Sequence, residues 1–475
     1  MCAIFGIYGE YNKDQLIKLS EIQKFRGPDH SGFYLNKKQN VSFGMNRLAV
    51  IDVKKGNQPK FSFDKKFIGF FNGCIFNFKE IKKNIIKKKI NFFTDSDTEV
   101  LVNAYSFWGD KCFNYFDGMW AVSLFNFKKK ELTLSRDYLG QKPLFFSKIR
   151  NNKLVYSSQI NGITDYLKKP VIEKKNIKLY YQLSHLPAPY TIYHNINQVA
   201  PGEIIKFTKL KFEKKNFWKI ENGPDYNIFF KKTNKSNFLE KFFINLKNYT
   251  YADKKTVLAL SGGIDSNLIR YSLKKIKKKI SAFVIGFKDD SYDESNHIFK
   301  EQNEIIIKNK LNKNDLTKTF KILRKKTFFL NGDSSTIPTF NLFKKIKKKT
   351  NNSLSGDGGD ELFFGYITFK AFFLMLWSKK FIPNFLAKFF YQAANYIKPN
   401  NDYLSFGLRL KLFLKYFHQD LSVINLFWLS NLEKKDLIDL TKIRSDHPEI
   451  NKIKKLFKKQ KNKMRFIQLY YFKYY

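Results

Sequence analysis

Cys2 is the residue of this chain whose position most directly indicates chemistry. Only Met1 precedes it, so removal of the initiator methionine leaves one residue that carries both a thiol and a free α-amine. An α-amine titrates near pH ~8, so part of it is a free base at neutral pH and can take the thiol proton. The resulting thiolate can attack a carbonyl carbon. Taken alone, a cysteine at position 2 is more often an accident of sequence.

Six further segments carry glycine and polar residues that favour the catalytic interpretation. The segments are Arg26-Gly27-Pro28-Asp29, residues 46–52, 71–77 and 96–100, then Ser261-Gly262-Gly263-Ile264-Asp265-Ser266 and residues 355–361. In this order they resemble the glutamine-hydrolysing asparagine synthetase family, in which a class II glutamine amidotransferase is joined to an ATP-pyrophosphatase synthetase domain. Each motif is weak by itself, but six in one order are strong evidence, and the resemblance extends from Met1 to Tyr475.

The resemblance implies a glutamine site in the N-terminal part of the chain. Cys2 is the expected nucleophile, and its own amine carries the proton. Asn72 and Gly73 are expected to stabilise the oxyanion. Arg47 is expected to pair with the α-carboxylate of glutamine, a geometry that suits a guanidinium, and Asp97 to accept from the α-amino group. The other residues that the resemblance assigns to this site are Leu48, Ala49, Val50, Ile51 and Cys74.

Two features of this site admit other interpretations or depart from the family. Asn72-Gly73 is also typical of a hairpin turn, and Arg47 could equally form a surface ion pair. The family usually carries glutamate where this chain has Cys74, and histidine or arginine where it has Asn46. The loss of one buried carboxylate beside a cationic ligand costs on the order of 1–3 kcal/mol.

The segment 261–266 follows an apolar stretch and precedes a helical one. Glycines let the backbone approach phosphate oxygens, which serine hydroxyls and helix N–H groups can bind. The Gly-Lys-Ser/Thr signature of a Walker loop is absent, and a plain helix N-cap turn is the alternative. The resemblance implies the pyrophosphate loop of enzymes that cleave ATP to AMP and pyrophosphate. It assigns ATP binding to Leu260, Ser261, Gly262, Gly263, Asp265, Ser266, Ile285, Gly286, Ser355 and Gly356.

An acidic cluster follows in residues 355–361. Asp357 stands where well-known members of the family carry a glutamate needed to form and consume the acyl-adenylate. Asp265 and Asp360 are the predicted Mg²⁺ ligands, and Glu361 completes the cluster. A solvated acidic loop is the alternative. Relative to the family, a segment with a Lys-Val-Asp-Arg-type motif is missing after Tyr475, so we expect a C-terminally truncated synthetase domain.

The elements that must position these residues change character along the chain. Up to about residue 210, short apolar strands alternate with turns, and residues 95–107 predict a helix capped by Asp95 or Ser96. The resemblance implies stacked antiparallel sheets between helices, which is the N-terminal-nucleophile hydrolase fold. From Thr256, strands at 256–260, 280–287 and 304–307 alternate with helices, which predicts an α/β parallel sheet, and the pattern is helical after Gly365. The expected domains are 1–210 and 237–475, with a linker at 211–236.

Composition limits the remaining possibilities. Three cysteines do not make a disulfide framework, and no signal peptide is visible, so we expect a cytoplasmic protein. The formal charge of +46 comes from lysine runs scattered through the whole chain, for which genome base composition is the simpler explanation. We therefore expect no specific nucleic acid. The apolar residues 371–377 meet two lysines too soon to span a bilayer, so we also expect no membrane.

The predicted reaction is the ATP-dependent synthesis of asparagine from aspartate. ATP activates aspartate as β-aspartyl-AMP, and ammonia released from glutamine at Cys2 displaces AMP. The expected partners are glutamine, aspartate, ATP and Mg²⁺. The sequence leaves the oligomeric state open, and a homodimer is one of the alternatives. Two alternatives remain: the acceptor is another carboxylate, such as a sugar acid of a surface polysaccharide, or the synthetase half is catalytically silent.

Overall fold

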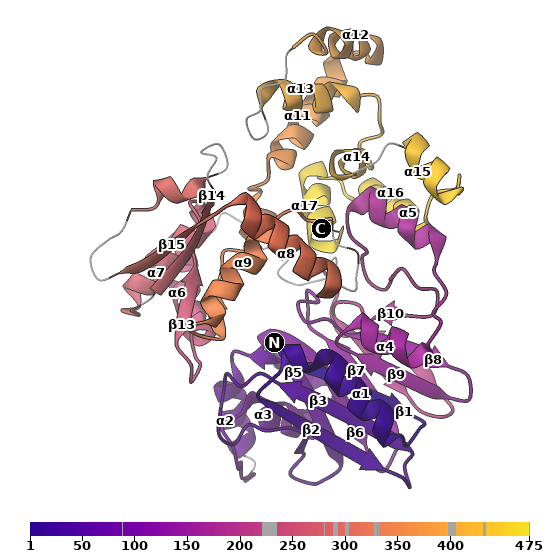
Figure 1. Ribbon diagram of the computed structural model, residues 1–475, viewed down its shortest axis with the longest axis vertical. Helices are drawn as coiled ribbons and strands as arrows, with labels where there is room; N and C mark the ends of the chain where they lie inside the picture. The colour runs from indigo at the N-terminus through magenta and orange to yellow at the C-terminus, as the bar shows by residue number, and fades with distance from the viewer. Residues whose placement is uncertain are drawn as a thin grey trace. The chain divides into compact units, whose positions relative to one another are not determined.

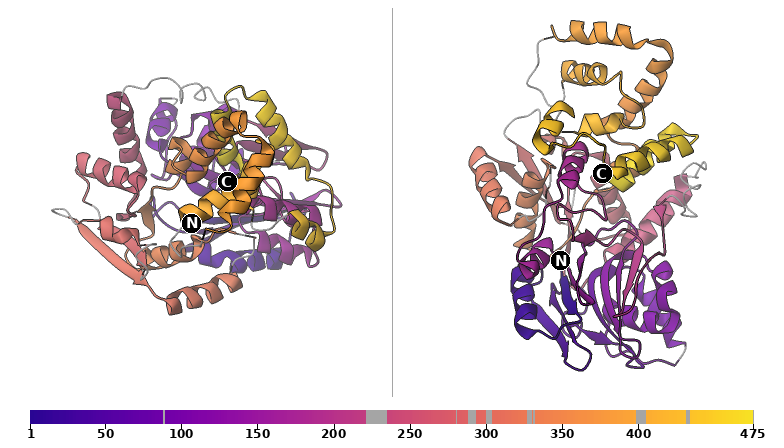
Figure 2. Two further views of the ribbon diagram at one scale, coloured as in Figure 1. Left: turned by 90° about the horizontal axis from the view of Figure 1, so that it is seen from above. Right: turned by 90° about the vertical axis from the view of Figure 1, so that its right-hand side faces the viewer.

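The computed structural model describes residues 1–87, 89–220, 235–279, 281–287, 293–299, 304–326, 330, 332–397, 405–430 and 434–474. The chain divides into two compact units, drawn in Figures 1 and 2. The first unit contains Met1–Ile172, Ala188–Thr256 and Lys349–Asn352. The second contains Glu173–Pro187, Val257–Lys348 and Ser353–Tyr475.

Two six-stranded antiparallel sheets form the first unit. The first sheet has the order β10-β8-β9-β1-β3-β2, and the second has the order β12-β11-β7-β6-β5-β4. The strands of the first sheet are β1 (Ala3–Tyr8), β2 (His30–Asn36), β3 (Val41–Arg47), β8 (Phe145–Ile149), β9 (Lys153–Ser157) and β10 (Asn197–Gln198). Those of the second are β4 (Lys60–Phe61), β5 (Phe67–Ile75), β6 (Gly118–Asn126), β7 (Glu131–Arg136), β11 (Glu203–Phe207) and β12 (Phe212–Asn216).

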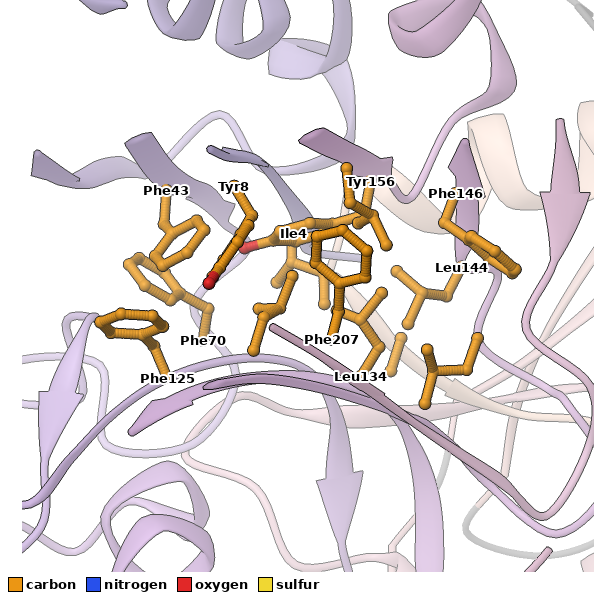
Figure 3. Close-up of a cluster of buried hydrophobic side chains, with 14 of the residues drawn as sticks. Ile4, Tyr8, Phe43, Phe70, Phe125, Leu134, Leu144, Phe146, Tyr156 and Phe207 are labelled. Atoms are coloured by element: carbon orange, nitrogen blue, oxygen red, sulfur yellow. The ribbon is translucent and has the colours of Figure 1, made fainter. Parts of the chain in front are cut away.

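The core of this unit lies between the two sheets. Side chains alternate between the faces of a strand, so Ile4 and Tyr8 of β1 point towards the second sheet. There they meet Phe43 of β3, Phe70 of β5 and Phe125 of β6, as Figure 3 shows. The ring of Phe43 lies 5.5 Å from that of Phe125 and 6.3 Å from that of Phe70. Aromatic packing therefore joins the sheets.

Helices cover the outer face of each sheet. The other face of β1 presents Phe5 and Ile7, which pack with α1 (Lys13–Gln23) and α4 (Ile160–Leu167). The outer face of the second sheet packs with α2 (Phe78–Ile86) and α3 (Asp97–Trp108). The resulting helix–sheet–sheet–helix layers confirm the predicted N-terminal-nucleophile hydrolase architecture. Two 3₁₀ helices, Lys24–Arg26 and Gly109–Tyr115, complete the layers.

The second unit contains the predicted parallel sheet. Its order is β15-β14-β13-β16, and β13 (Thr256–Ala259), β14 (Ser281–Phe287) and β15 (Ile305–Leu311) run parallel. The fourth strand is β16 (Asn352–Leu354). One face packs with α7 (Ile264–Lys275) and the other with α9 (Thr336–Lys347). Both faces are covered, which is typical of parallel sheets.

Beyond this sheet, the described part of the second unit is helical, as the sequence predicts. The helix α5 (Lys174–Leu183) joins this region, where Lys178 donates to the carbonyls of Ile443, Arg444 and Ser445. The remaining elements are α8 (Lys313–Lys326), α10 (Gly359–Phe363), α11 (Ile367–Phe381), α12 (Asn384–Ala394), α13 (Phe406–Lys415), α14 (Ile424–Leu429), α15 (Lys434–Thr441), α16 (Pro448–Lys459), α17 (Lys463–Tyr474) and the 3₁₀ helix Glu294–His297.

The unit boundaries differ from the expected domain limits. The strand β12 lies inside the predicted linker 211–236 but pairs with β11, because Phe207 and Phe212 face each other across the hairpin. The helix α6 (Lys235–Tyr249) belongs to the first unit, where the hydroxyl of Tyr249 donates to Asp117. Residues 221–234 of the predicted linker lie outside the described residues.

By length and composition, one stretch of the described chain, Gly359–Phe381, could cross a membrane. This stretch consists of α10 and α11, and Phe364 between them adopts a left-handed conformation with φ 60°. The longer helix, α11, has 15 residues. It therefore extends about 22 Å, which is less than the ~30 Å of a bilayer core.

We expect Phe43→Ala to lower the free energy of unfolding of the first unit by about 3–5 kcal/mol, because it empties the space between the sheets. Phe93→Ala is the matched control, since Phe93 is 81% exposed in the same unit. Hydrogen exchange of β1, β3 and β5 in the full chain measures the effect. Equal protection of the three strands in both variants would contradict this account of the core.

Candidate active sites

The pairing of β1 with β3 places Cys2 beside the segment that follows β3. Ala3 is opposite Asn46 in this antiparallel pair, so the residues just outside the two strands, Cys2 and Leu48, come together. The amide of Leu48 donates to the sulfur of Cys2 at 3.3 Å, and the thiol lies 3.7 Å from the Leu48 carbonyl oxygen. The half-buried thiol therefore lies at the edge of the first sheet, where β1 begins and β3 ends.

Three charged groups from separate segments act on this thiol. Burial raises the pKa of Cys2, whereas the N-terminal amine and Arg47 lower it and Asp97 raises it. Burial also lowers the pKa of the Met1 amine to about 5. The Met1 amine is therefore unprotonated at neutral pH, and removal of Met1 would place the amine of Cys2 itself beside the thiol. The structure thus brings together Cys2, Arg47 and Asp97, which the sequence assigned to one site.

The motif 26–29 fixes the start of the chain, a role that the sequence did not reveal. The buried Arg26 donates through Nε to the carbonyl of Cys2 at 3.1 Å. Any Cβ at Gly27 would lie 2.2 Å from the carbonyl oxygen of Asn46, so only glycine fits against β3. The carboxylate of Asp29 accepts from the amide of Ala49 at 2.8 Å. The sequence showed the motif, but it did not show that these residues position the N-terminal residues and the segment after β3.

Arg47 is buried and organises the loop that follows it. Its Nη1 donates to the carbonyl of Val53 and to Asn57 Oδ1, and its Nη2 donates to the carbonyls of Ile51 and Asp52. With 4% of its surface exposed, it is not a surface ion pair. The guanidinium therefore shapes the segment that presents Leu48, Ala49, Val50 and Ile51.

Asn72 and Gly73 lie inside β5, so the hairpin-turn interpretation is wrong. A Cβ at Gly73 would lie 2.1 Å from the carbonyl oxygen of Met119 on β6, and the close strand pairing therefore requires glycine. Asn72 is 1% exposed, and its Nδ2 has no hydrogen-bond partner among the described residues. A buried donor without a partner costs about 1–3 kcal/mol, and a developing oxyanion would recover that energy.

Asp97 begins α3, whose predicted cap is confirmed at Ser96, because Ser96 Oγ accepts from the amide of Glu99. One carboxylate oxygen of Asp97 accepts from the amide of Ile75 at 3.2 Å. Burial raises the pKa of Asp97 to about 7. Between Asn72 and Ile75 on β5, Cys74 has a pKa raised by burial and by Asp97.

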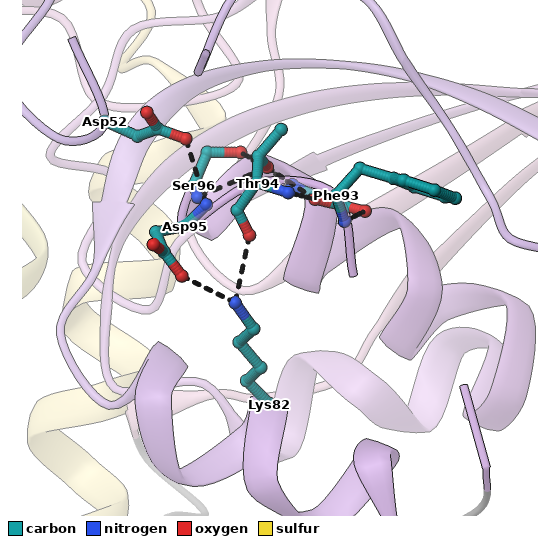
Figure 4. A network of polar contacts seen from close by, with 7 residues as sticks. Asp52, Lys82, Phe93, Thr94, Asp95 and Ser96 are labelled. Carbon is teal, nitrogen blue, oxygen red and sulfur yellow. Dashed lines mark hydrogen bonds and ion pairs between the residues drawn. The ribbon is translucent and has the colours of Figure 1, made fainter. Parts of the chain in front are cut away.

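Hydrogen bonds from two separate segments fix the loop before α3 (Figure 4). Lys82 of α2 donates to the carbonyl of Thr94 at 3.0 Å and to the carboxylate of Asp95 at 2.7 Å. The amide of Asp95 donates to Asp52 at 2.9 Å, in the loop that Arg47 organises. The position of Asp97 is therefore linked to that of the 48–57 loop.

The sequence analysis missed Lys142. It is 8% exposed, and burial lowers the pKa of its ammonium, while Cys74 and Cys2 raise it, which places a cation close to both thiols. Its position is set by Asp137, whose carboxylate accepts from the amides of Lys142 and Trp120. The sequence signal that could have identified Lys142 was the group of charged and polar residues at 136, 137, 141 and 142.

In the second unit, the segment 261–266 forms the turn after β13 and the first residues of α7. The hydroxyl of Ser266 lies 3.0 Å from that of Ser261, and the amide of Ser261 donates to Ser266 Oγ at 3.1 Å. Gly263 is the N-cap, and no side chain caps the helix. The first N–H groups of α7 and the two hydroxyls are thus gathered in one place, which suits an anion.

The acidic loop packs against this helix start. A Cβ at Gly359 would lie 2.3 Å from Asp265 Cγ, so glycine is what lets the loop approach the carboxylate. Burial, with Glu361 second, raises the pKa of Asp265. Glu361 accepts from Tyr366 through Oε1, and its Oε2 has no hydrogen-bond partner among the described residues. Two neighbouring carboxylates with a free oxygen fit a divalent cation.

The other predicted residues of this site lie at the same end of the sheet or in the acidic loop. Leu260 follows β13, and its amide donates to the carbonyl of Phe283, while Ile285 and Gly286 end β14. Ser355 donates to the carboxylate of Asp357 at 2.8 Å. The carboxylate of Asp360 lies against Gly365, and Glu361 is the acid beside Asp265. In the described ranges, no group of three or more His, Cys, Asp or Glu has the arrangement of a metal site.

Comparison with known proteins finds a family match for each half of the chain. Residues 1–218 match the glutamine amidotransferase domain family, and residues 245–474 match the asparagine synthase family. "Putative asparagine synthetase (glutamine-hydrolyzing) 2" of Methanocaldococcus jannaschii is 31% identical over 420 residues, which are 81% of this chain and 79% of that protein. "Asparagine synthetase (glutamine-hydrolyzing) 1" of Bacillus subtilis is 28% identical over 77% of this chain and 59% of that protein.

The solved structure of the allosteric regulatory enzyme of purine biosynthesis aligns with 63% of this chain and 68% of its own, at 17% identity and a TM-score of 0.36. That likeness is too weak to support an argument. The sequence matches, together with the two architectures described above, define a glutamine-dependent amide ligase. The chain belongs to the glutamine-hydrolysing asparagine synthetase family.

We expect Asp97→Asn to remove a pH dependence of stability. The folded protein holds a proton on Asp97 up to about pH 7, whereas the unfolded chain loses it near pH ~4. The folded state therefore binds more protons in this window, and the free energy of unfolding falls as the pH rises from about 4 to about 7. The variant side chain is neutral throughout, so this part of the slope disappears from urea unfolding curves.

The matched control is Asp95→Asn. Asp95 is an exposed carboxylate two residues away, and its hydrogen bond with Lys82 lowers its pKa. This variant should keep the slope of the parent between about pH 4 and about 7. An unchanged slope in Asp97→Asn would show that Asp97 is ionised throughout.

Proposed function

We propose that this chain hydrolyses glutamine at Cys2 and uses the ammonia to convert the side-chain carboxylate of aspartate into an amide, at the expense of ATP. Family membership supports a glutamine-dependent amide ligase, and the choice of aspartate rests on the relatives' names. The observation that carries the proposal is the convergence of the Cys2 thiol, the Arg47 guanidinium and the buried Asp97 carboxylate in the first unit.

In the first step, the amine of Cys2, exposed by removal of Met1, takes the thiol proton. The thiolate attacks the side-chain amide carbon of glutamine, and the oxyanion accepts from Asn72 Nδ2 and the backbone of Gly73. Collapse of the intermediate expels ammonia, which takes its proton from the amine. Water then hydrolyses the thioester to glutamate. Asp97 and the 48–51 segment hold the amino-acid end of the substrate.

In the second step, the carboxylate of aspartate attacks the α-phosphorus of ATP, which forms an acyl-adenylate and releases pyrophosphate. Ser261, Ser266 and the first N–H groups of α7 bind the pyrophosphate oxygens. Mg²⁺, held by Asp265 with Asp360 or Glu361, would neutralise charge on the phosphates. Ammonia then attacks the acyl carbon, AMP leaves, and the amide forms.

We expect Cys2→Ala to abolish glutamine hydrolysis, because it removes the nucleophile. Mass spectrometry of the parent should show a chain that begins at Cys2, and a thiol-alkylating glutamine analogue should label this residue. Cys112→Ala is the control, because Cys112 is a fully buried core residue, and it should keep the activity. Labelling confined to Cys74 or Cys112 would overturn the assignment.

We expect Asp265→Asn to lower the rate of pyrophosphate release by about tenfold or more when ammonia and aspartate replace glutamine. This assay bypasses the first site and isolates the second. Asp439→Asn, an exposed acid on α15, is the control and should match the parent. Pyrophosphate release by the parent with another carboxylate but not with aspartate would assign a different acceptor. No release with any carboxylate would limit the chain to glutamine hydrolysis.

A further inference from the structure

The helices α11 and α12 of the second unit each leave an apolar stripe uncovered. On α11, Phe373, Leu374, Trp377 and Phe381 lie at i, i+1, i+4 and i+8, which is one face of a helix. They are 53–66% exposed. On α12, Phe385, Leu386, Phe389 and Phe390 lie at i, i+1, i+4 and i+5, also on one side of the helix, and three of the four are more than 45% exposed. We call these eight residues the aromatic face.

The opposite side of α11 packs on α17. The helix is therefore anchored in the second unit, and only its apolar stripe is exposed. The ring of Phe369 lies 4.6 Å from that of Tyr471 on α17, and the ring of Phe372 lies 6.2 Å from that of Phe466. The helix α12 packs against α13. In Figures 1 and 2, α11, α12 and α13 group together at one end of the second unit.

Lysines accompany the aromatic face, and acids do not. At 100° per residue, Lys370 falls within the α11 stripe, and Lys380 and Lys388 border the two stripes. All three are exposed, and none has an ion-pair partner among the described residues. From residue 362 to residue 401 the sequence contains five lysines and no aspartate or glutamate. The face is therefore both apolar and uniformly basic.

The combination of exposed rings and lysines favours one kind of binding partner for the aromatic face. A second copy of the same face would bring lysines against lysines, and a purely apolar protein surface would leave the ammonium of Lys370 without an acid. Anionic lipid offers phosphate to the lysines and acyl chains to the rings. The α11 helix is too short to span the bilayer, so it lies in the interfacial plane.

We propose that the aromatic face docks this protein on anionic membrane surfaces. This inference is independent of the proposed function. It replaces the sequence-based expectation of no membrane partner, which rested only on the spanning length of residues 371–377. Trp377, next to Phe381 with 5.0 Å between ring centroids, would sit at the headgroup level.

Co-sedimentation of the full chain with vesicles tests this proposal. We expect binding to vesicles of phosphatidylglycerol and phosphatidylcholine in equal parts, and at least about tenfold weaker binding to phosphatidylcholine alone. The triple variant Phe373→Ser, Trp377→Ser and Phe385→Ser should lose at least about tenfold in partitioning. Phe320→Ser on α8 is the control, because Phe320 is 58% exposed in the same unit, and it should bind like the parent.

The overall charge of +46 requires a second control. Replacing Lys370, Lys380 and Lys388 with Gln should weaken binding more than replacing Lys313, Lys318 and Lys321, which are exposed on α8 and remove the same charge. Equal losses from the two sets would overturn the proposal in favour of diffuse attraction. No vesicle binding, with the aromatic variants dissociating a dimer, would assign the face to a second copy.

A fluorescence readout keeps the proposal falsifiable if the serine variants do not fold. Trp377→Phe retains an aromatic ring and should still bind the vesicles. Brominated lipid should quench part of the tryptophan emission of the parent and less of that of Trp377→Phe. Equal quenching of the two proteins would show that the aromatic face does not enter the lipid.

Discussion

The antiparallel register between β1 and β3 is the constraint on which the glutamine site depends. Because Ala3 is opposite Asn46, the first residues of the chain and the segment after β3 leave the sheet at the same edge. A slip of one residue would turn Cys2 to the other face and move Leu48 away from it. The register is held by the core, since Ile4, Tyr8 and Phe43 must all point between the sheets.

Burial then determines the electrostatics at this edge. The same desolvation lowers the pKa of the N-terminal amine, raises that of Cys2 and raises that of Asp97. It leaves the Met1 amine unprotonated at neutral pH and makes Asp97 a group that ionises only near neutrality. Arg26 and Arg47 donate hydrogen bonds to backbone carbonyls at this edge. The basic groups therefore hold loops in place while their positive charge remains available to the thiol and to a substrate carboxylate.

The second unit places its candidate ATP site by a different means. A parallel sheet ends its strands at one edge, so Leu260 and Gly286 arrive there from adjacent strands. Glycines at 356 and 359 let the acidic loop touch the start of α7. The aromatic face on α11 and α12 belongs to the same unit, but its residues are exposed and lie outside the buried core.

The sequence by itself predicted the two architectures and proposed the candidate reactive residues. Apolar stretches predicted strands at 256–260, 280–287 and 304–307, where β13, β14 and β15 lie, and Ser96 was one of the two predicted caps of α3, because both signals are local. Motif order determined the family. Tertiary structure alone decided that Arg47 binds its own loop, that Lys142 lies near Cys2, that Glu361 adjoins Asp265 and that β12 and α6 join the first unit. These facts depend on contacts between residues far apart in the chain, which local periodicity does not encode.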